Sequence, residues 1–277
     1  MVKKIRDWVR PIMQVLILII MFFVPYIVNI AGIIKGIFYN TPIDFDNIKY
    51  YYAMKMGNGV IGIILVLLIL FNCIRKSNED YCLNKGNYYH EHFYLGYLFC
   101  AKVLGYKKCS LIRTPVYMQF KLVINDTFNE YSVGKEEDYN IAEDESIEIG
   151  GIYDSYTSSV NMVLSDTYPI SKGMLPASTS NLSTIWIVRT DSKKMVRTFS
   201  KKFCNTIKEI VSGLPNNVET IHLFSTLNPK HSLWIANNVF KMAGRCQVKA
   251  LKVFPQSNKN GNWNFAEKGV IIYDELG

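Results

Sequence analysis

Charged side chains are absent from two stretches near the start of the chain, residues 11–34 and 56–74, and no comparable stretch follows them. About 20 apolar residues at 1.5 Å rise cross a hydrocarbon core of about 30 Å. Each stretch therefore predicts a membrane-spanning helix. The first stretch has no small-residue cleavage site after it and a second span follows, so we expect a retained anchor rather than a signal peptide.

Several chemical signatures are also missing. None of the six cysteines stands in a CxxC pair, which argues against a zinc or thioredoxin-like site. The motifs G-x-G-x-x-G, G-x-x-x-x-G-K-[ST] and G-x-S-x-G do not occur. His90 and His92 form an HxH pair, but on the helix expected there the two side chains point in different directions. We expect no catalytic residue, no metal and no cofactor.

A broad basic surface is lacking as well. Residues 1–76 carry nine basic and three acidic side chains, whereas the rest of the chain carries 22 basic and 20 acidic ones. The net charge of +8 therefore resides mainly in the membrane anchor, where lipid headgroups and topology account for it. A near-balanced remainder argues against binding of a DNA or RNA duplex, which needs a clustered basic face.

The basic residues that flank the spans predict the orientation of the anchor. Four precede the first span and two follow the second, whereas the loop between the spans mixes both signs: Lys3, Lys4, Arg6, Arg10, Arg75 and Lys76, against Lys35, Lys49, Lys55, Asp44 and Asp46. Because basic flanks stay in the cytoplasm, we expect a multi-pass protein with both termini cytoplasmic and reduced cysteines.

Small and polar residues within or beside the spans leave two alternatives open. Gln14, Asn29, Asn58 and Gly62 belong to this group. Small residues let helices approach closely and amides can bond between them, so these residues can support oligomerisation. They can equally well pack the two helices of one hairpin together.

We divide the chain into an anchor, residues 1–80, and a cytoplasmic domain, residues 81–277. An aromatic-rich segment, residues 81–106, predicts a helix that leads from the membrane into the domain. Between residues 115 and 165, alternating apolar and polar side chains between turn signals predict a β-rich part with four strands: VYMQFKLVI, YSVG, SIEIGGIY and SVNMVLS.

The last hundred residues have the rhythm of an α/β sheet. Strands are expected at 183–189, 220–224 and 247–254, with helices at 192–212 and at 231–243, the second ending at Gly244. Alternating strands and helices imply right-handed crossovers and a parallel sheet. The run GVIIY, residues 269–273, can add an edge strand.

A ligand of such a sheet binds beyond the carboxyl ends of the strands, next to helix N-termini. The segment FSTLNPKHS, residues 224–232, occupies that place, and Thr190 follows the preceding strand. The hydroxyl, amide, lysine and imidazole groups of the segment 224–232, together with free N–H groups at the start of the helix, favour binding of a phosphate. The alternative is ordinary N-capping by Asn228 or Ser232.

The run IHLFSTLNPKHSLWIANNVF resembles the strand, polar loop and helix of SAVED and related CARF domains, which in that family form Rossmann-like sensors of cyclic oligonucleotides. The order of two spans and a SAVED-like domain is similar to membrane effectors of CBASS antiphage defence. The resemblance is clearest over residues 183–277. Family domains contain two CARF-like halves, of which one is traced here; VNMVLSDTYPI is either the start of the other half or a strand and turn.

The resemblance implies a ligand site after the strand at Leu223. It contains Ser225, Thr226, Asn228, His231 and Ser232, to which we add Lys230 as a counter-charge to phosphate. Asp166, Thr167 and Tyr168 are candidates for contacting a base or ribose. The alternative for these three is a turn stabilised by the Asp side chain before Pro169.

We therefore expect a non-enzymatic effector in the inner membrane of a bacterium. Binding of a cyclic oligonucleotide would drive homo-oligomerisation and disruption of the bilayer. Three alternatives remain: a β-barrel-type sensor of cyclic dinucleotides behind two spans, a nucleotide-processing hydrolase that uses Asp166, His222 or His231, and a scaffold that holds a partner through its aromatic segment.

Overall fold

The computed structural model describes residues 8–38, 48–134, 140–141, 146–152, 157–189, 198–241, 248–259 and 262–275. The chain forms two compact units. The first comprises Met1–Gly86 and Leu95–Lys108, and the second comprises Asn87–Tyr94 and Cys109–Gly277. The expected domain division after residue 80 stays a prediction.

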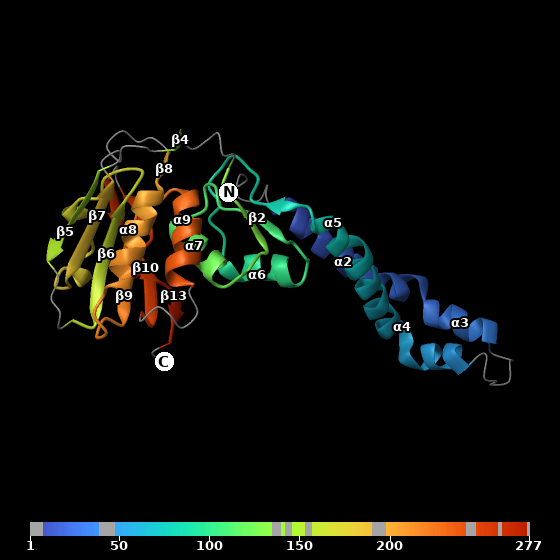
Figure 1. Cartoon of the computed structure of the whole chain (residues 1–277). Coiled ribbons are helices and arrows are strands. Elements are labelled where there is room, and N and C mark those ends of the chain that lie inside the picture. Colours follow the sequence, from blue (N-terminus) through green and yellow to red (C-terminus); the bar gives the residue numbers. More distant parts are fainter. Residues whose placement is uncertain are drawn as a thin grey trace. The chain divides into compact units, whose positions relative to one another are not determined.

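Long apolar helices make up most of the first unit. They are α2 (Val9–Val28), α3 (Ile30–Phe38), α4 (Ile48–Ile69), a π-helix (Leu70–Arg75) and α5 (Lys76–Asn78), as Figure 1 shows. The segments Val9–Ile37 and Gly57–Asn78 are long and apolar enough to cross a membrane. Asn29 adopts a left-handed conformation, with φ of 53°, and separates α2 from α3. These elements match the two predicted spans.

The polar and small residues of the spans pair within the hairpin. Gln14 and Asn78 exchange two amide hydrogen bonds of 2.8 and 3.0 Å, and the side-chain oxygen of Asn58 accepts from the Ala31 N–H at 2.9 Å. A Cβ added at Gly62 would lie 2.5 Å from the carbonyl oxygen of Phe22, so α2 and α4 approach closely there. The structure thus shows the hairpin-packing alternative.

The predicted helix over residues 81–106 is confined to α6 (Tyr94–Lys102), after a short strand β1 (Cys82–Leu83). Asn84 adopts a left-handed conformation, with φ of 61°, which a continuing helix does not allow. His90 and His92 lie outside the helix, so their expected helical placement is wrong. Among the residues that the structure describes, no cluster of His, Cys, Asp or Glu is arranged to hold a metal.

A six-stranded open sheet forms the centre of the second unit. Its order is β13 (Val270–Asp274), β10 (Ala250–Val253), β9 (Thr220–Ser225), β6 (Ser159–Ser165), β7 (Thr184–Arg189) and β5 (Ile147–Ile152). The four central strands are parallel, with Met162 of β6 opposite Leu223 of β9. The edge strands β13 and β5 pair antiparallel. The mixed α/β class is confirmed, and β13 is the expected edge strand.

Helices α8 (Lys201–Ser212) and α9 (Pro229–Ile235), the latter extended by a π-helix (Ala236–Phe240), lie alongside each other against the sheet (Figure 1). Helix α8 begins later than predicted, because Thr198 and Phe199 form strand β8 and the Ser200 hydroxyl caps the Phe203 N–H at 3.0 Å. The second helix ends at Phe240 rather than Ala243; Gly244 lies outside the described residues.

Smaller elements complete the unit. They are β2 (Lys108–Ser110), β3 (Glu130–Ser132), α7 (Val116–Ile124), the pair β4 (Asn140–Ile141) with β8 (Thr198–Phe199), two 3-10 turns (Lys172–Met174 and Ala177–Thr179) and the hairpin β11 (Gln256–Lys259) with β12 (Asn262–Phe265). The segment VYMQFKLVI is α7, so its prediction as a strand is wrong. The helix starts after its N-cap Pro115, and the side-chain amide of Gln119 donates to the Thr114 carbonyl at 2.7 Å.

The segment SVNMVLS is β6, which lies between β7 and β9 in the same sheet. It does not start a second α/β half, and the described residues contain one such sheet.

Candidate functional site

The sheet reverses its direction of winding between β6 and β9. From β6 the chain proceeds to β7 on one side, and it then crosses back to β9 and continues outward to β10. Neighbouring parallel strands whose connections leave in opposite directions open a crevice at their carboxyl ends. The topology therefore predicts a ligand site beyond Ser165 and Ser225.

A cavity of about 600 Å³ lies at that place, entirely within the second unit. The segments after β6, β9 and β10 line it together with Tyr89, Glu91 and the start of α7. The lining residues are Tyr89, Glu91, Pro115, Val116, Tyr117, Thr167, Tyr168, Ser225, Thr226, Leu227, Phe254, Pro255, Gln256, Ser257, Trp263 and Val270. The volume is that of a site for a small organic molecule.

Aromatic rings dominate the wall of the cavity. Tyr89, Tyr117, Tyr168 and Trp263 come from four separate segments of the chain. Burial raises the pKa of the Tyr117 and Tyr168 phenols above their ordinary value, so both stay neutral near pH 7. Among the described residues of the lining, Glu91 is the charged one. This wall suits a planar, uncharged ring better than a phosphate.

Two buried polar atoms of the lining have no hydrogen-bond partner among the described residues. They are the hydroxyl oxygen of Ser225 and the side-chain nitrogen of Gln256. The carbonyl oxygen of the Gln256 side chain accepts from the Tyr168 hydroxyl, which fixes the amide with its nitrogen as the remaining donor. Buried polar groups are normally bonded, so these two atoms are positioned to bind a ligand.

Thr226 joins the two loops that form the floor of the cavity. Its hydroxyl donates to the Tyr168 carbonyl at 2.8 Å and accepts from the Asp166 N–H at 3.1 Å. Its carbonyl accepts from the Thr167 N–H at 3.1 Å. The segments after β6 and β9 are therefore held in one arrangement before any ligand binds.

Behind the cavity lies a fully buried ionic network. The Asp166 carboxylate pairs with the Arg189 guanidinium at 3.0 Å, and its other oxygen is 2.7 Å from Nδ1 of His231. Nε2 of His231 accepts from the Ser200 N–H at 2.8 Å. Because Nε2 is an acceptor, the Nδ1 atom carries the ring proton and donates it to Asp166.

The same network caps helix α9. The Asn228 N–H donates to Asp166 at 2.8 Å, and the Asn228 side-chain oxygen accepts from the His231 N–H at 2.9 Å. Asn228 is thus an ordinary N-cap, the alternative considered for this position. Because both backbone groups are already bonded, a phosphate has no access to them.

The predicted site residues fall into separate groups. Ser225, Thr226 and Tyr168 line the cavity, as does Thr167. The side chains of Asp166, Asn228, His231 and Ser232 are buried outside the lining. The Asp166 carboxylate bonds to Asn228, His231 and Arg189 rather than to groups of its own turn. In that turn the Ser165 hydroxyl accepts from the Ile170 N–H.

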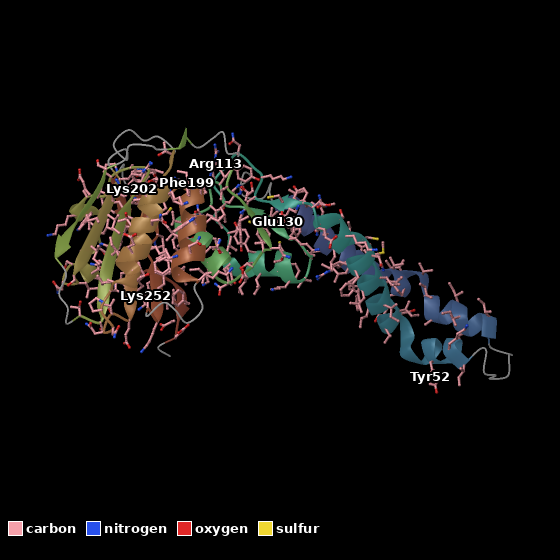
Figure 2. All side chains as sticks on the ribbon, viewed as in Figure 1. Tyr52, Arg113, Glu130, Phe199, Lys202 and Lys252 are labelled. Carbon is pink, nitrogen blue, oxygen red and sulfur yellow. The ribbon has the colours of Figure 1, made fainter. Side chains whose placement is uncertain are left out.

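One further predicted residue lies elsewhere. The Lys230 ammonium lies over the ring of Phe199, which Figure 2 labels, 4.9 Å from its centroid. Thr190 lies outside the described residues. Sequence reasoning missed Tyr89, Tyr117, Gln256 and Trp263. The aromatic run after residue 87 was the available signal for Tyr89.

A second cavity of about 770 Å³ lies near the amino ends of β6 and β7. Its walls include Gly151, Asn161, Lys172, Thr184 and Trp186. It lies away from the carboxyl ends of the strands, so the cavity at the β6–β9 reversal is the stronger candidate.

Two solved structures of an Acinetobacter baumannii Cap4 SAVED/CARF-domain containing receptor are similar to this chain, one with the cyclic trinucleotide 2'3'3'-cAAA and one with 3'3'3'-cAAA. Their TM-scores are 0.44 and 0.39 at 9% and 8% identity, over 65% and 64% of this chain. The chain spans 41% of the length of each. No curated protein matches.

A family model matches residues 1–272, nearly the whole chain. The model describes a 2TM effector domain, which agrees with the two apolar helices and indicates a membrane protein. The chain belongs to the family of SMODS- and Ubiquitin system-associated 2TM effector domains, SUa-2TM.

Proposed function

We propose that this protein is a non-enzymatic antiphage effector of the bacterial inner membrane that senses a cyclic oligonucleotide. In this proposal the α/β unit binds the messenger in the cytoplasm, the protein then oligomerises, and the hairpins together disrupt the bilayer. Membership of the 2TM effector family and the two apolar helices support the membrane role. The cavity at the β6–β9 reversal is the single observation that carries the sensing role.

The chemistry of the cavity fits the bases of such a messenger. Aromatic side chains stack on any nucleobase, and Tyr89, Tyr117, Tyr168 and Trp263 supply such faces. The Ser225 hydroxyl and the Gln256 amide can bond to base edges or ribose hydroxyls. Because the described lining includes a carboxylate and no lysine or arginine, the phosphates belong at the rim of the cavity rather than inside it.

A switch requires that the ligand bind the assembled state more tightly than the free one. The cavity floor is connected to both helices by direct bonds. The Thr226 hydroxyl accepts from the Asp166 N–H, and the Asp166 carboxylate accepts from the N–H of Asn228, the N-cap of α9. The His231 ring accepts from the N–H of Ser200, the N-cap of α8. A ligand that shifts the floor therefore shifts the ends of two helices, which offers a route to a new assembly surface.

The hydrolase alternative is less well supported by the geometry. His231 is fully buried, and its Nε2 accepts a backbone N–H, so it has no lone pair for a substrate proton. His222 is not among the lining residues of the cavity, and its ring packs against Phe254. Burial and, to a lesser degree, Lys252 lower the pKa of His222. We propose binding without turnover.

The test is titration of the full chain, in lipid nanodiscs, with cyclic di- and trinucleotides, together with dye leakage from vesicles that contain the protein. We expect at least one cyclic nucleotide to bind and to cause leakage. Linear mononucleotides serve as the negative ligand. A protein that binds no cyclic nucleotide, or that binds one and leaves the vesicles sealed and the protein monomeric, contradicts the proposal.

Two serines provide matched variants for this test. Ser225 and Ser232 are both buried, and neither hydroxyl has a hydrogen-bond partner among the described residues, but Ser225 alone of the two lines the cavity. A net hydrogen bond is worth about 1 kcal/mol, so Ser225→Ala should weaken binding by about fivefold with little change in stability. Ser232→Ala should leave affinity unchanged. Equal effects of the two variants would place the ligand elsewhere.

A further inference from the structure

Helix α6 exposes an apolar stripe although its opposite face is already buried. Leu95, Phe99 and Val103 follow one another at four-residue spacing and are 75%, 41% and 37% exposed. The Val103 N–H still bonds to the Phe99 carbonyl at 2.9 Å, so the helical turn continues to that residue. Tyr97 and Cys100, on the other side, are fully buried, and burial raises the pKa of the Cys100 thiol to about 12. A helix that is apolar on both sides is normally covered on both sides.

The first unit fixes this helix to the end of the two spans. Nη1 of Arg75, the last residue of the π-helix in the second span, donates to the carbonyls of Lys102 and Val103 at 2.8 and 3.1 Å. Asn78 donates to the carbonyl of Leu104 at 2.8 Å. These bonds hold the C-terminal end of α6 at the residues where the second span ends.

The first span holds the other half of the helix. The ring of Trp8, next to the start of α2, meets Tyr97 edge-on at 6.0 Å between centroids. A Cβ added at Gly96 would lie 2.5 Å from the Trp8 ring, so the backbone of α6 passes directly against the indole. The apolar stripe is therefore fixed at the level where both spans leave the bilayer.

Charge near the stripe matches an anionic lipid surface. Lys102 is one residue from Val103 on the helix and is exposed, and Arg75 and Lys76 lie at the C-terminal end of the second apolar segment, Gly57–Asn78. Lysine stems lie along apolar surface while their ammonium groups reach the headgroups. Basic side chains at this level are attracted to anionic lipids.

We propose that α6 lies in the membrane interface as a third membrane contact, with Leu95, Phe99 and Val103 inserted among the upper acyl chains. A short helix in this position holds the cytoplasmic end of the hairpin against the lipid. The inference rests on the membrane-spanning role of the two apolar helices. It does not depend on the identity of the messenger.

The test measures quenching of tryptophan emission by lipids brominated near the headgroup or near the chain end. The full chain is placed in phosphatidylethanolamine and phosphatidylglycerol vesicles, and the emission of the wild-type chain is subtracted. Leu95→Trp should add emission that shallow bromines quench more strongly than deep ones. Ile149→Trp, at an exposed position on β5, should add emission that neither lipid quenches.

Ile20→Trp, in the first span, separates the two possible failures. It should be quenched by deep bromines if the span crosses the bilayer. Quenching of Ile20→Trp without quenching of Leu95→Trp overturns the inference and leaves the spans intact; absence of both overturns the spans as well. Phe99→Trp, a conservative aromatic change, repeats the measurement if Leu95→Trp does not fold. If neither brominated lipid nor aqueous iodide quenches the emission added by Leu95→Trp, protein buries this side chain, which also overturns the inference.

Discussion

Individual polar residues after the strands have two different environments. Ser225 and Thr226 line a cavity, whereas Asn228, His231 and Ser232, a few residues later, are buried outside it. All five belong to residue types that bind ligands, and serine, threonine and asparagine also cap helices. Their position beyond β9 follows from the sequence pattern, but the direction of each side chain depends on what packs around it.

The buried Asp166–Arg189 pair gives a prediction at this scale. Asp166→Asn leaves the guanidinium of Arg189 without its carboxylate in a site closed to water. Removal of one partner of a buried pair costs about 3–5 kcal/mol. Thermal unfolding of the full chain in detergent, followed by tryptophan emission, should show this loss.

The matched control is Glu219→Gln, which removes the carboxylate of the exposed pair with Lys249. Surface pairs contribute about 0–1 kcal/mol, so this variant should unfold close to wild type. Comparable losses in Asp166→Asn and Glu219→Gln would show that the buried network does not stabilise the α/β unit.

At the scale of elements, strands with a strong parallel pattern were predictable. The strands β7, β9 and β10 follow from buried runs separated by helices, and the observed sheet confirms them. The segment VYMQFKLVI misled because its β-branched and aromatic residues alternate like a strand. Most of its apolar side chains are buried around a helix, which local alternation does not reveal.

The edge strand β5 offers a test of its pairing. Gly151 has φ of +124°, and a Cβ there would lie 1.9 Å from the carbonyl oxygen of Thr184 on β7. Gly151→Ala should therefore destabilise the α/β unit by about 1–3 kcal/mol through backbone strain alone, with more from the clash. A Cβ added at its neighbour Gly150 meets no atom within 4 Å in the described part of the chain, so Gly150→Ala should be nearly neutral. Chemical denaturation measures the unfolding midpoint of both variants. Similar midpoints for Gly151→Ala and Gly150→Ala would mean that β5 does not pair with β7 as described.

At the scale of the whole molecule, the cavity proposed for sensing and the two apolar helices lie in separate compact units. This division predicts that a change in the hairpin spares ligand affinity. Gly62→Leu forces a side chain against the Phe22 carbonyl and should separate α2 from α4. We expect the variant to bind the messenger as wild type does but to lose ligand-triggered dye leakage.

Gly36→Leu is the control for the hairpin, because a Cβ at Gly36 has no atom of the described residues within 4 Å. It should keep both binding and leakage. Undiminished leakage in Gly62→Leu would show that close packing of the two spans is not needed for membrane action.

The sequence by itself determined the two apolar helices and the parallel α/β pattern, because both depend on local hydrophobic periodicity and on the length needed to cross a bilayer. Only the tertiary structure decided that β6 lies beside β9, since strand order depends on contacts between segments distant in the chain. The adjacency of β6 and β9 creates the reversal of the sheet. Tertiary packing also brings Tyr89, Tyr117, Tyr168 and Trp263 around one cavity and buries the side chain of His231. Long-range packing, which no local pattern encodes, therefore selects which of the predicted polar residues can meet a ligand.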